Sequence, residues 1–410
     1  FVSDKSIFLI IGLCILVIIA EIYMAELMLL LAPGFYETPD RLMAAIDLAR
    51  ITMPYLPLIS IVALWAAIAN AHDHFKVGAA APVIANICFI FGALLIPVVS
   101  SQMGMLKAVP IAIALLIAGL VQLLFLYVSL AKLYAVPALV WPRLSAAGRK
   151  MWRNFLPAAA GAGGMQINLL IDLILASLLP VGAISWLYFA DRVAQLPLGI
   201  IGIALGTALL PRLSAAEAAG ESIEVRESLS EALGLAGFFV IPAVAGLVLC
   251  SFQIIQGLFA YGAFGDSDAR MAASALAAYA CGLPGFVVVK ILQTAFYAAG
   301  LPGIVLKISL ATVVTNVVGS LILMPILWHV VLALATSISG TVAATIMLFI
   351  LASRGRLSSA FLPTLGKITL STVFMGVTVI TNFNKIFFAN FINLFPVHIT
   401  IFTYFSCAYK

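Results

Sequence analysis

Four polar residues stand inside long apolar stretches of this sequence, where they could together bind an anion. Arg192 follows Asp191 in the stretch YFADRVAQLPLGIIGIALG, and Lys290 precedes Gln293 by one helical turn in another. A guanidinium can bind two phosphate oxygens through parallel N–H bonds, and a lysine adds a point charge. Because charges are costly inside apolar segments, these residues predict a water-filled cationic cavity. In the alternative interpretation, the charged groups only reach a nearby polar interface along their own side chains.

A second group of polar residues could bind a monovalent cation. Asp172 lies inside one apolar stretch, and Asn316, Ser320 and Thr336 lie in two later ones. One carboxylate with several neutral oxygens suits Na⁺ better than a divalent ion, and an unpaired carboxylate could take up H⁺ instead. Hydrogen bonds between helices would explain the same residues. We expect no other cofactor or metal, because the five cysteines stand singly.

The composition excludes most soluble protein classes. Of the 410 residues, 64% are hydrophobic and 9% are charged, against about 45–50% and about 25% in soluble proteins. A soluble fold, a collagen-like rod and a disordered chain are therefore excluded. The net charge of +5 comes from scattered basic residues, which argues against nucleic acid as a partner. No HExxH, GxSxG or Walker A motif occurs, so we predict a polytopic membrane protein that is not an enzyme.

The apolar segments predict an all-α membrane helix bundle. A helix needs about 20 apolar residues to cross the hydrocarbon core, and these segments are too long for barrel strands. About twelve candidate spans occur: 7–32, 45–69, 79–100, 108–132, 155–179, 183–210, 231–260, 271–297, 303–325, 329–352, 362–382 and 390–408.

Two polar interruptions separate the predicted spans. The first, 133–154, is rich in proline and basic residues, and the second, 211–230, contains Glu217 and Glu221. The second predicts either a short helix on the membrane surface or a solvated linker. If Lys5 is cytoplasmic, most basic loop residues fall on its side of the membrane, as the positive-inside rule requires.

A faint internal duplication predicts two pseudo-symmetric lobes around a central cavity. The stretches around Pro54 and Pro284 share an early proline, an apolar run and small residues at the exit, and such repeats build many transporters. The predicted organisation is the remainder of an N-terminal lobe with four helices (1–132), a basic cytoplasmic linker (133–154), a C-terminal lobe with six helices (155–352) and two C-terminal helices (353–410).

Four stretches resemble the MurJ (MviN) family of lipid II flippases, within the multidrug/oligosaccharidyl-lipid/polysaccharide exporter superfamily. They are LYFADRVAQLPLGIIGIALGTALLPRLS (187–214), APGF (32–35), ARITMPYLPLISIVALWAAIANAHDHFKVGAAAPVIANI (49–87) and VVVKILQTAFYA (287–298). The resemblance implies a fourteen-helix, two-lobed transporter with a cationic cavity in the bacterial inner membrane. It implies that alternating access moves an undecaprenyl-diphosphate-linked peptidoglycan precursor, lipid II, to the outer leaflet. Other proteins of cell-wall synthesis would be partners.

The resemblance also implies roles for the candidate residues. Arg192 corresponds to the family's cavity arginine after Ala-Asp, and Lys290 to its basic position before Phe-Tyr. Asp191 and Gln293 complete our substrate-binding set because they stand close to these two residues in the sequence.

The candidate cation site matches the family in part. Asp172, Asn316 and Thr336 fall where some members hold Na⁺, whereas Ser320 replaces the acid or amide usual there. LPGI (301–304) also departs from the family's Asp-Thr-x-Pro turn.

Two further expectations follow from the family pattern. This chain would lack the family's first two helices, as a fragment that starts inside a longer protein, and its last helix would be cut short. A cation-coupled small-molecule or drug exporter of the same superfamily is the alternative function, although such a protein would more naturally expose acids in its cavity. A membrane glycosyltransferase or scaffold of wall synthesis is a weaker alternative, because no acidic metal-binding loop is seen.

Overall fold

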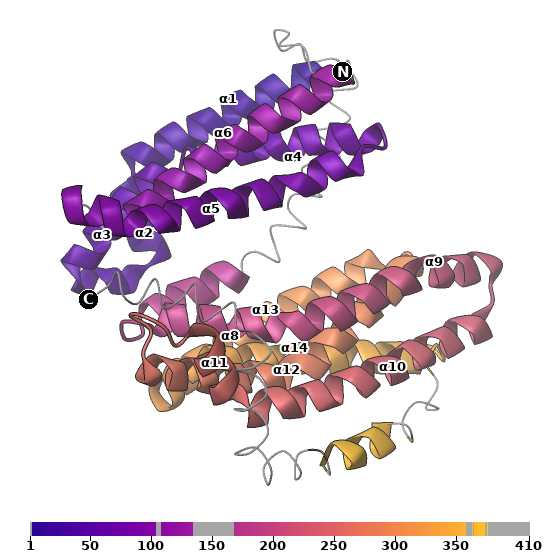
Figure 1. Cartoon of the computed structure of the whole chain (residues 1–410). Coiled ribbons are helices and arrows are strands. Elements are labelled where there is room, and N and C mark those ends of the chain that lie inside the picture. The colour runs from indigo at the N-terminus through magenta and orange to yellow at the C-terminus, as the bar shows by residue number, and fades with distance from the viewer. Residues whose placement is uncertain are drawn as a thin grey trace. The chain divides into compact units, whose positions relative to one another are not determined.

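The computed structural model describes residues 2–103, 108–133, 168–357, 363, 365–373 and 375 (Figure 1). Within these residues every regular element is a helix. Eight helices there are long and apolar enough to cross a membrane, or nine if one bent pair counts as a single span. The predicted all-α membrane class is therefore confirmed. The chain divides into two compact units, residues 1–160 and 161–410.

Most predicted spans coincide with helices of the described residues. Three predicted spans lie partly or wholly outside them: 155–179, 362–382 and 390–408. Of the first, the structure describes a short apolar helix, Asn168–Ser177. The predicted linker 133–154 also lies outside the described residues, apart from its first residue.

The first unit is built from consecutive packed helices. They are α1 (Val2–Ile22), α2 (Met24–Leu31), the 3₁₀ helix η1 (Pro33–Glu37), α3 (Pro39–Thr52), α4 (Tyr55–Ala71), α5 (Phe75–Met103) and α6 (Val109–Lys132). α5 packs against α4 and α6, and α6 also contacts α3. Buried Gln122 joins α6 to α5 by donating from Nε2 to the Ala81 carbonyl oxygen at 2.7 Å.

The first predicted span, 7–32, is bent and not one straight helix. α1 and α2 meet at an angle of 86° at Tyr23, whose backbone lies outside the helical region. The sequence has no proline or glycine at this point, so its apolar run predicted a continuous helix.

The second unit surrounds α12 with other helices (Figure 1). Its labelled helices are α8 (Ala183–Pro197), α9 (Ala204–Ala219), α10 (Ser222–Leu249), α11 (Ser251–Phe259), α12 (Asp266–Ala298), α13 (Pro302–Leu327) and α14 (Val330–Ser353), with a π-helical turn, η2 (Leu198–Ile203), between α8 and α9. α12 packs against α8, α9, α10, α11 and α14, and its buried residues form much of the core. It therefore lies against α8 and α14, which carry Arg192 and Thr336, and itself carries Lys290 and Gln293.

The interruption at 211–230 is neither a separate surface helix nor a linker, which corrects both sequence interpretations. α9 and α10 run through it and meet at a short turn around Gly220. Arg212 of α9 pairs with Glu224 at 3.7 Å and Glu231 at 3.1 Å (N–O distances), both in α10. These ion pairs join the polar ends of the two helices, so both helices continue beyond their apolar segments.

Small residues let α12 and α14 cross closely. A Cβ atom added to Gly282 would lie 2.6 Å from Ser337 Cα, and one added to Gly285 would lie 2.9 Å from Thr341 Cα. Ser337 Oγ donates across the crossing to the Ala278 carbonyl oxygen at 2.7 Å. Such close approach is how helices associate where lipid removes the hydrophobic driving force.

Gly282→Ala is expected to lower the free energy of unfolding by about 1–3 kcal/mol, because the added methyl must push α14 away. The measurement is thermal unfolding of the purified protein in detergent. Gly246→Ala is the matched control, since a Cβ atom there meets nothing within 4 Å inside α10. If both variants unfold at the wild-type temperature, the crossing is not tightly packed.

Candidate functional site

Helix α8 turns one face to the core of the second unit and another away from it. The core face carries its buried residues, Ala183, Leu187, Ala190, Val193 and Ala194. Tyr188, Arg192 and Leu196 recur every four residues and are exposed. Since residues four apart share a helix face, these three side chains form one exposed surface, here called the Arg192 face.

Trp186 anchors the start of α8 to two other helices. Its indole Nε1 donates to Asp268 Oδ1 of α12 at 2.8 Å, and its ring contacts that of His329, next to α14, with centroids 5.1 Å apart. Gly182 makes room for the indole, because a Cβ atom there would lie 2.6 Å from Trp186 Cζ2 and its φ of 103° is left-handed. The anchor fixes the rotation of α8 and hence which side of the helix carries Arg192.

Asp191 and Arg192 differ in their surroundings, as their neighbouring positions in a helix require. Asp191 is half-buried and accepts a hydrogen bond from Gln195 Nε2, one turn further along α8. Arg192 is exposed, and its Cζ lies 5.0 Å from the centroid of the Tyr188 ring. Arg192 takes part in no salt bridge in the described part of the chain. Its N–H groups can therefore bind an anionic ligand.

The π-helical turn η2, which follows α8, lies beside Lys290 of α12. The turn follows Pro197, and π turns are frequent at functional sites. A Cβ atom on Gly202 would lie 3.7 Å from Lys290 Cβ, and one on Gly206 would lie 3.3 Å from Thr294 Oγ1. Gly202 of η2 and Gly206 of α9 thus bring both segments close to the Lys290 region of α12.

Arg192 and Lys290 lie at different positions along the helix axes of the second unit, here called two levels. Gly202, which neighbours Lys290, follows Arg192 by ten residues, which is about 15 Å of helix rise. Lys290 and Gln293 are both half-buried. The structure therefore separates the predicted substrate-binding residues into two groups, Asp191 with Arg192 and Lys290 with Gln293.

The predicted cation-site residues are brought together in part. Asn316 Nδ2 of α13 donates to Asp172 Oδ1 at 3.0 Å and to Asn168 Oδ1 at 2.9 Å. Asn168 Nδ2 donates to Asp172 Oδ2 at 3.1 Å, and Ser320 Oγ donates to Asn316 Oδ1 at 3.4 Å. Asn316 and Ser320 are fully buried, so this Asp172 cluster connects the helix Asn168–Ser177 to α13.

Thr336 is hydrogen-bonded within its own helix. Its Oγ1 donates to the Leu332 carbonyl oxygen of α14 at 2.8 Å, and the described residues show no hydrogen bond from it to the Asp172 cluster. The cluster still offers one carboxylate and three neutral side-chain oxygens, from Asn168, Asn316 and Ser320, a set that fits a monovalent cation. Both amide groups would have to turn their oxygens toward the ion, because their N–H groups now face Asp172.

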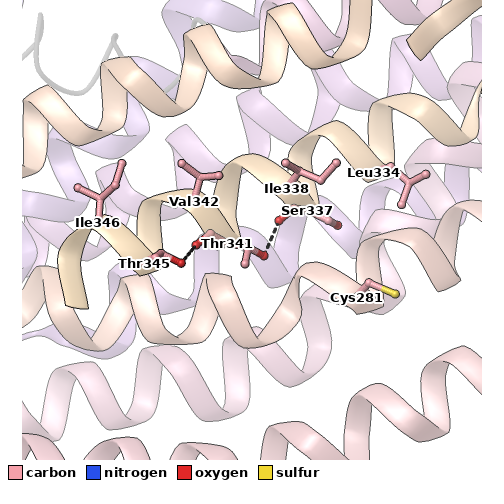
Figure 2. Close-up of a pocket in the computed structure, with 8 residues that line it drawn as sticks. All are labelled: Cys281, Leu334, Ser337, Ile338, Thr341, Val342, Thr345 and Ile346. Atoms are coloured by element: carbon pink, nitrogen blue, oxygen red, sulfur yellow. Dashed lines mark hydrogen bonds between the residues drawn. The ribbon is translucent and has the colours of Figure 1, made fainter. Parts of the chain in front are cut away.

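A groove of about 370 Å³ lies elsewhere, against α12 and α14. Figure 2 shows its lining residues, Cys281, Leu334, Ser337, Ile338, Thr341, Val342, Thr345 and Ile346. Thr341 and Thr345 each donate to a carbonyl oxygen one turn earlier in α14, both at 2.8 Å. With no charged residue in its lining, this groove does not suit a phosphate group.

The sequence analysis did not include Tyr188 or Gln195 in the site, and it did not count Asn168, one turn before Asp172, among the cation ligands. Asn168 lies four residues before Asp172, Tyr188 four before Arg192, and Gln195 four after Asp191. Each pair is hydrogen-bonded or in ring contact in the structure. A search for polar or aromatic residues at i ± 4 from each charged residue would have found all three.

Solved transporter structures share this fold. A lipid II flippase MurJ in an inward closed conformation superposes with a TM-score of 0.81 at 24% identity, covering 98% of this chain and 82% of that one. An inward-facing multidrug resistance MATE family transporter of the MOP superfamily gives 0.68 at 16%, covering 86% and 80%. The helices and these likenesses define a multi-pass membrane protein with a MurJ/MATE transporter fold.

Sequence comparison narrows this class. The family model of lipid II flippase MurJ matches residues 1–402. The chain is 32% identical over 336 residues to a probable lipid II flippase MurJ of Rickettsia prowazekii, covering 82% of this chain and 65% of that protein. It is 34% identical over 333 residues to one of Buchnera aphidicola, covering 80% and 64%. The chain therefore belongs to the MurJ family, and it spans just under two thirds of the length of these relatives.

Proposed function

We propose that this protein moves an undecaprenyl-diphosphate-linked peptidoglycan precursor, lipid II, from the inner to the outer leaflet by alternating access. The observation that carries the proposal is the exposed Arg192, whose neighbouring acid Asp191 is engaged by Gln195. The Arg192 guanidinium forms no salt bridge with the residues that the structure describes, so it can bind two oxygens of a diphosphate. Membership of the MurJ family supports lipid II as the substrate.

Arg192 and Lys290, at their two different levels, suit a headgroup that travels across the membrane. Under the predicted orientation, Lys290 lies nearer the cytoplasmic end of its helix pair and Arg192 nearer the outer end. The lysine would attract the diphosphate as a point charge, and the arginine would bind it bidentately at the second level. The isoprenoid tail would stay in the bilayer while the headgroup crosses.

A drug exporter with the same fold is less well supported. Exporters of organic cations would use acids that face the substrate, whereas the Arg192 face of α8 exposes a base and its acid is half-buried. We therefore propose transport of an anionic lipid headgroup, without a catalysed reaction. The site would lie in the bacterial inner membrane, with lipids and cell-wall synthesis proteins around it.

The proposal is tested in cells depleted of their own lipid II flippase. Expression of this protein is expected to restore access of an external probe to lipid II in the outer leaflet. A protein that inserts normally but leaves lipid II inaccessible, while it exports ethidium, would favour the exporter instead.

We also propose that the Asp172 cluster binds Na⁺, with H⁺ as the alternative coupling ion. The half-buried Asp172 carboxylate lies between two amides and needs a positive partner when it is ionised. An ion that prefers one conformational state shifts the equilibrium by its difference in affinity between the states. Coupling through this cluster would therefore require the packing of the helix Asn168–Ser177 against α13 to change during transport.

Na⁺ is expected to raise the melting temperature of the purified protein, and Asp172→Asn is expected to abolish that rise. The loss follows because the variant has no negative charge to hold the ion. Glu227→Gln is the control, as it removes an exposed acid of α10 outside the cluster and should keep the Na⁺ response. Equal responses of wild type and Asp172→Asn, with K⁺ acting like Na⁺, would leave the cluster as hydrogen bonding between helices.

A further inference from the structure

We propose that Tyr188 is a positioning residue that holds the guanidinium of Arg192 ready for the diphosphate, an inference that rests on the proposed function. Tyr188 precedes Arg192 by one turn of α8, and Arg192 Cζ lies 5.0 Å from its ring centroid. A cation at this distance over an aromatic ring is attracted by the ring's negative face. This attraction acts on the delocalised charge and leaves the N–H donors for phosphate oxygens.

The Tyr188 ring is itself supported by other aromatic rings. It meets Phe189 edge to face, with centroids 5.8 Å apart and planes at 74°. Phe189 packs against Phe259 at the end of α11 at 4.6 Å and against Phe264 in the α11–α12 connection at 5.2 Å (centroid distances). The support for Tyr188 therefore comes through Phe189 from residues outside α8.

The aromatic contacts reduce the entropy cost of fixing the Arg192 side chain when a ligand binds. Arg192 is long and exposed, and within the described part of the chain no salt bridge holds it, so it can adopt many rotamers. Fixing such a side chain on binding costs about 0.5–1.5 kcal/mol. Asp191 accepts a hydrogen bond from Gln195, and in the described residues it forms no salt bridge that would hold the guanidinium. A ring that holds the guanidinium before the ligand arrives reduces this cost and increases affinity.

The test measures binding of undecaprenyl diphosphate to the purified protein in lipid nanodiscs. Tyr188→Leu is expected to weaken binding about 3- to 10-fold, the range given by cation–π attraction at a partly desolvated site. Tyr188→Phe keeps the ring and should bind within about 2-fold of wild type, since phenylalanine also forms cation–π pairs. Phe239→Leu is the matched control, because Phe239 of α10 is also half-exposed and lies edge to face on its neighbour Phe238.

Each variant is measured again in an Arg192→Gln background, which shows whether Tyr188 acts through the arginine. The inference holds if Tyr188→Leu weakens binding only when Arg192 is present. It is overturned if Tyr188→Leu binds like wild type while Arg192→Gln binds weakly, or if Tyr188→Leu has the same effect in both backgrounds. If Arg192→Gln itself binds like wild type, the proposed site fails, and the inference fails with it.

Discussion

Arg192→Ala is expected to reduce delivery of lipid II to the outer leaflet about 100-fold, because two charge-assisted hydrogen bonds to the diphosphate are worth about 3 kcal/mol. Arg192→Lys should recover little, since an ammonium group lacks the bidentate geometry. The measurement is external labelling of lipid II in cells where this protein is the sole lipid II flippase. Membrane insertion should remain normal, as Arg192 is exposed on α8.

Arg270→Ala provides a matched control for that variant. Arg270 is also an exposed arginine over an aromatic ring, with Cζ 5.6 Å from the Phe252 centroid, but it lies at the start of α12 and outside the Arg192 face. Transport by this control should stay close to wild type. Normal lipid II delivery by Arg192→Ala, or equal losses in both variants, would remove Arg192 from the substrate pathway.

Lys290→Gln is expected to lower lipid II delivery about 10-fold, a smaller loss because a lysine contributes one charge without bidentate contacts. The glutamine keeps a similar length and polarity beside Gly202, so the packing of α9 on α12 should survive. The same labelling assay measures it. If Lys290 and Arg192 act at successive levels on one headgroup, each single variant should already be impaired.

Lys307→Gln is the control for the second lysine. Lys307 is exposed near the start of α13, on a different helix from Lys290, and its loss should leave transport unchanged. A Lys290→Gln variant that transports as well as this control would show that the headgroup does not use Lys290.

The fold follows from the sequence wherever the apolar pattern decides the structure. Apolar runs of spanning length predicted most helices from α4 to α14, because a helix satisfies its own backbone hydrogen bonds in lipid. The predicted span 231–260 instead divides into α10 and α11 at Cys250. The bend at Tyr23 could not be predicted, since no helix-breaking residue marks it. α9 and α10 continue through 211–230, where Arg212 pairs with Glu224 and Glu231, and a hydropathy pattern does not contain such polar contacts.

The sequence predicts the site residues that belong to one helix, but not the contacts between residues of different helices. Arg192 and Lys290 stand out because each is a charge in an apolar run, and the i ± 4 neighbours Tyr188 and Gln195 can be found by spacing. Their difference in level depends on where α12 crosses the π-helical turn, which is a property of packing. The contact of Asn316 with Asp172 joins residues 144 positions apart, so spacing along the chain could not establish it.

Photocrosslinking from the Arg192 face tests the central claim most directly. Leu196 lies one turn beyond Arg192 on the same face and is 60% exposed, so a benzophenone amino acid fits there without disturbing the Asp191–Gln195 pair. Irradiation of living cells is expected to crosslink lipid II to position 196, and Arg192→Gln should abolish the product. Phe349 of α14, which is 73% exposed and lies outside the Arg192 face, serves as the control and should give little crosslinking. Equal crosslinking at both positions, or a product at position 196 that persists in Arg192→Gln, would contradict binding of the diphosphate at this face.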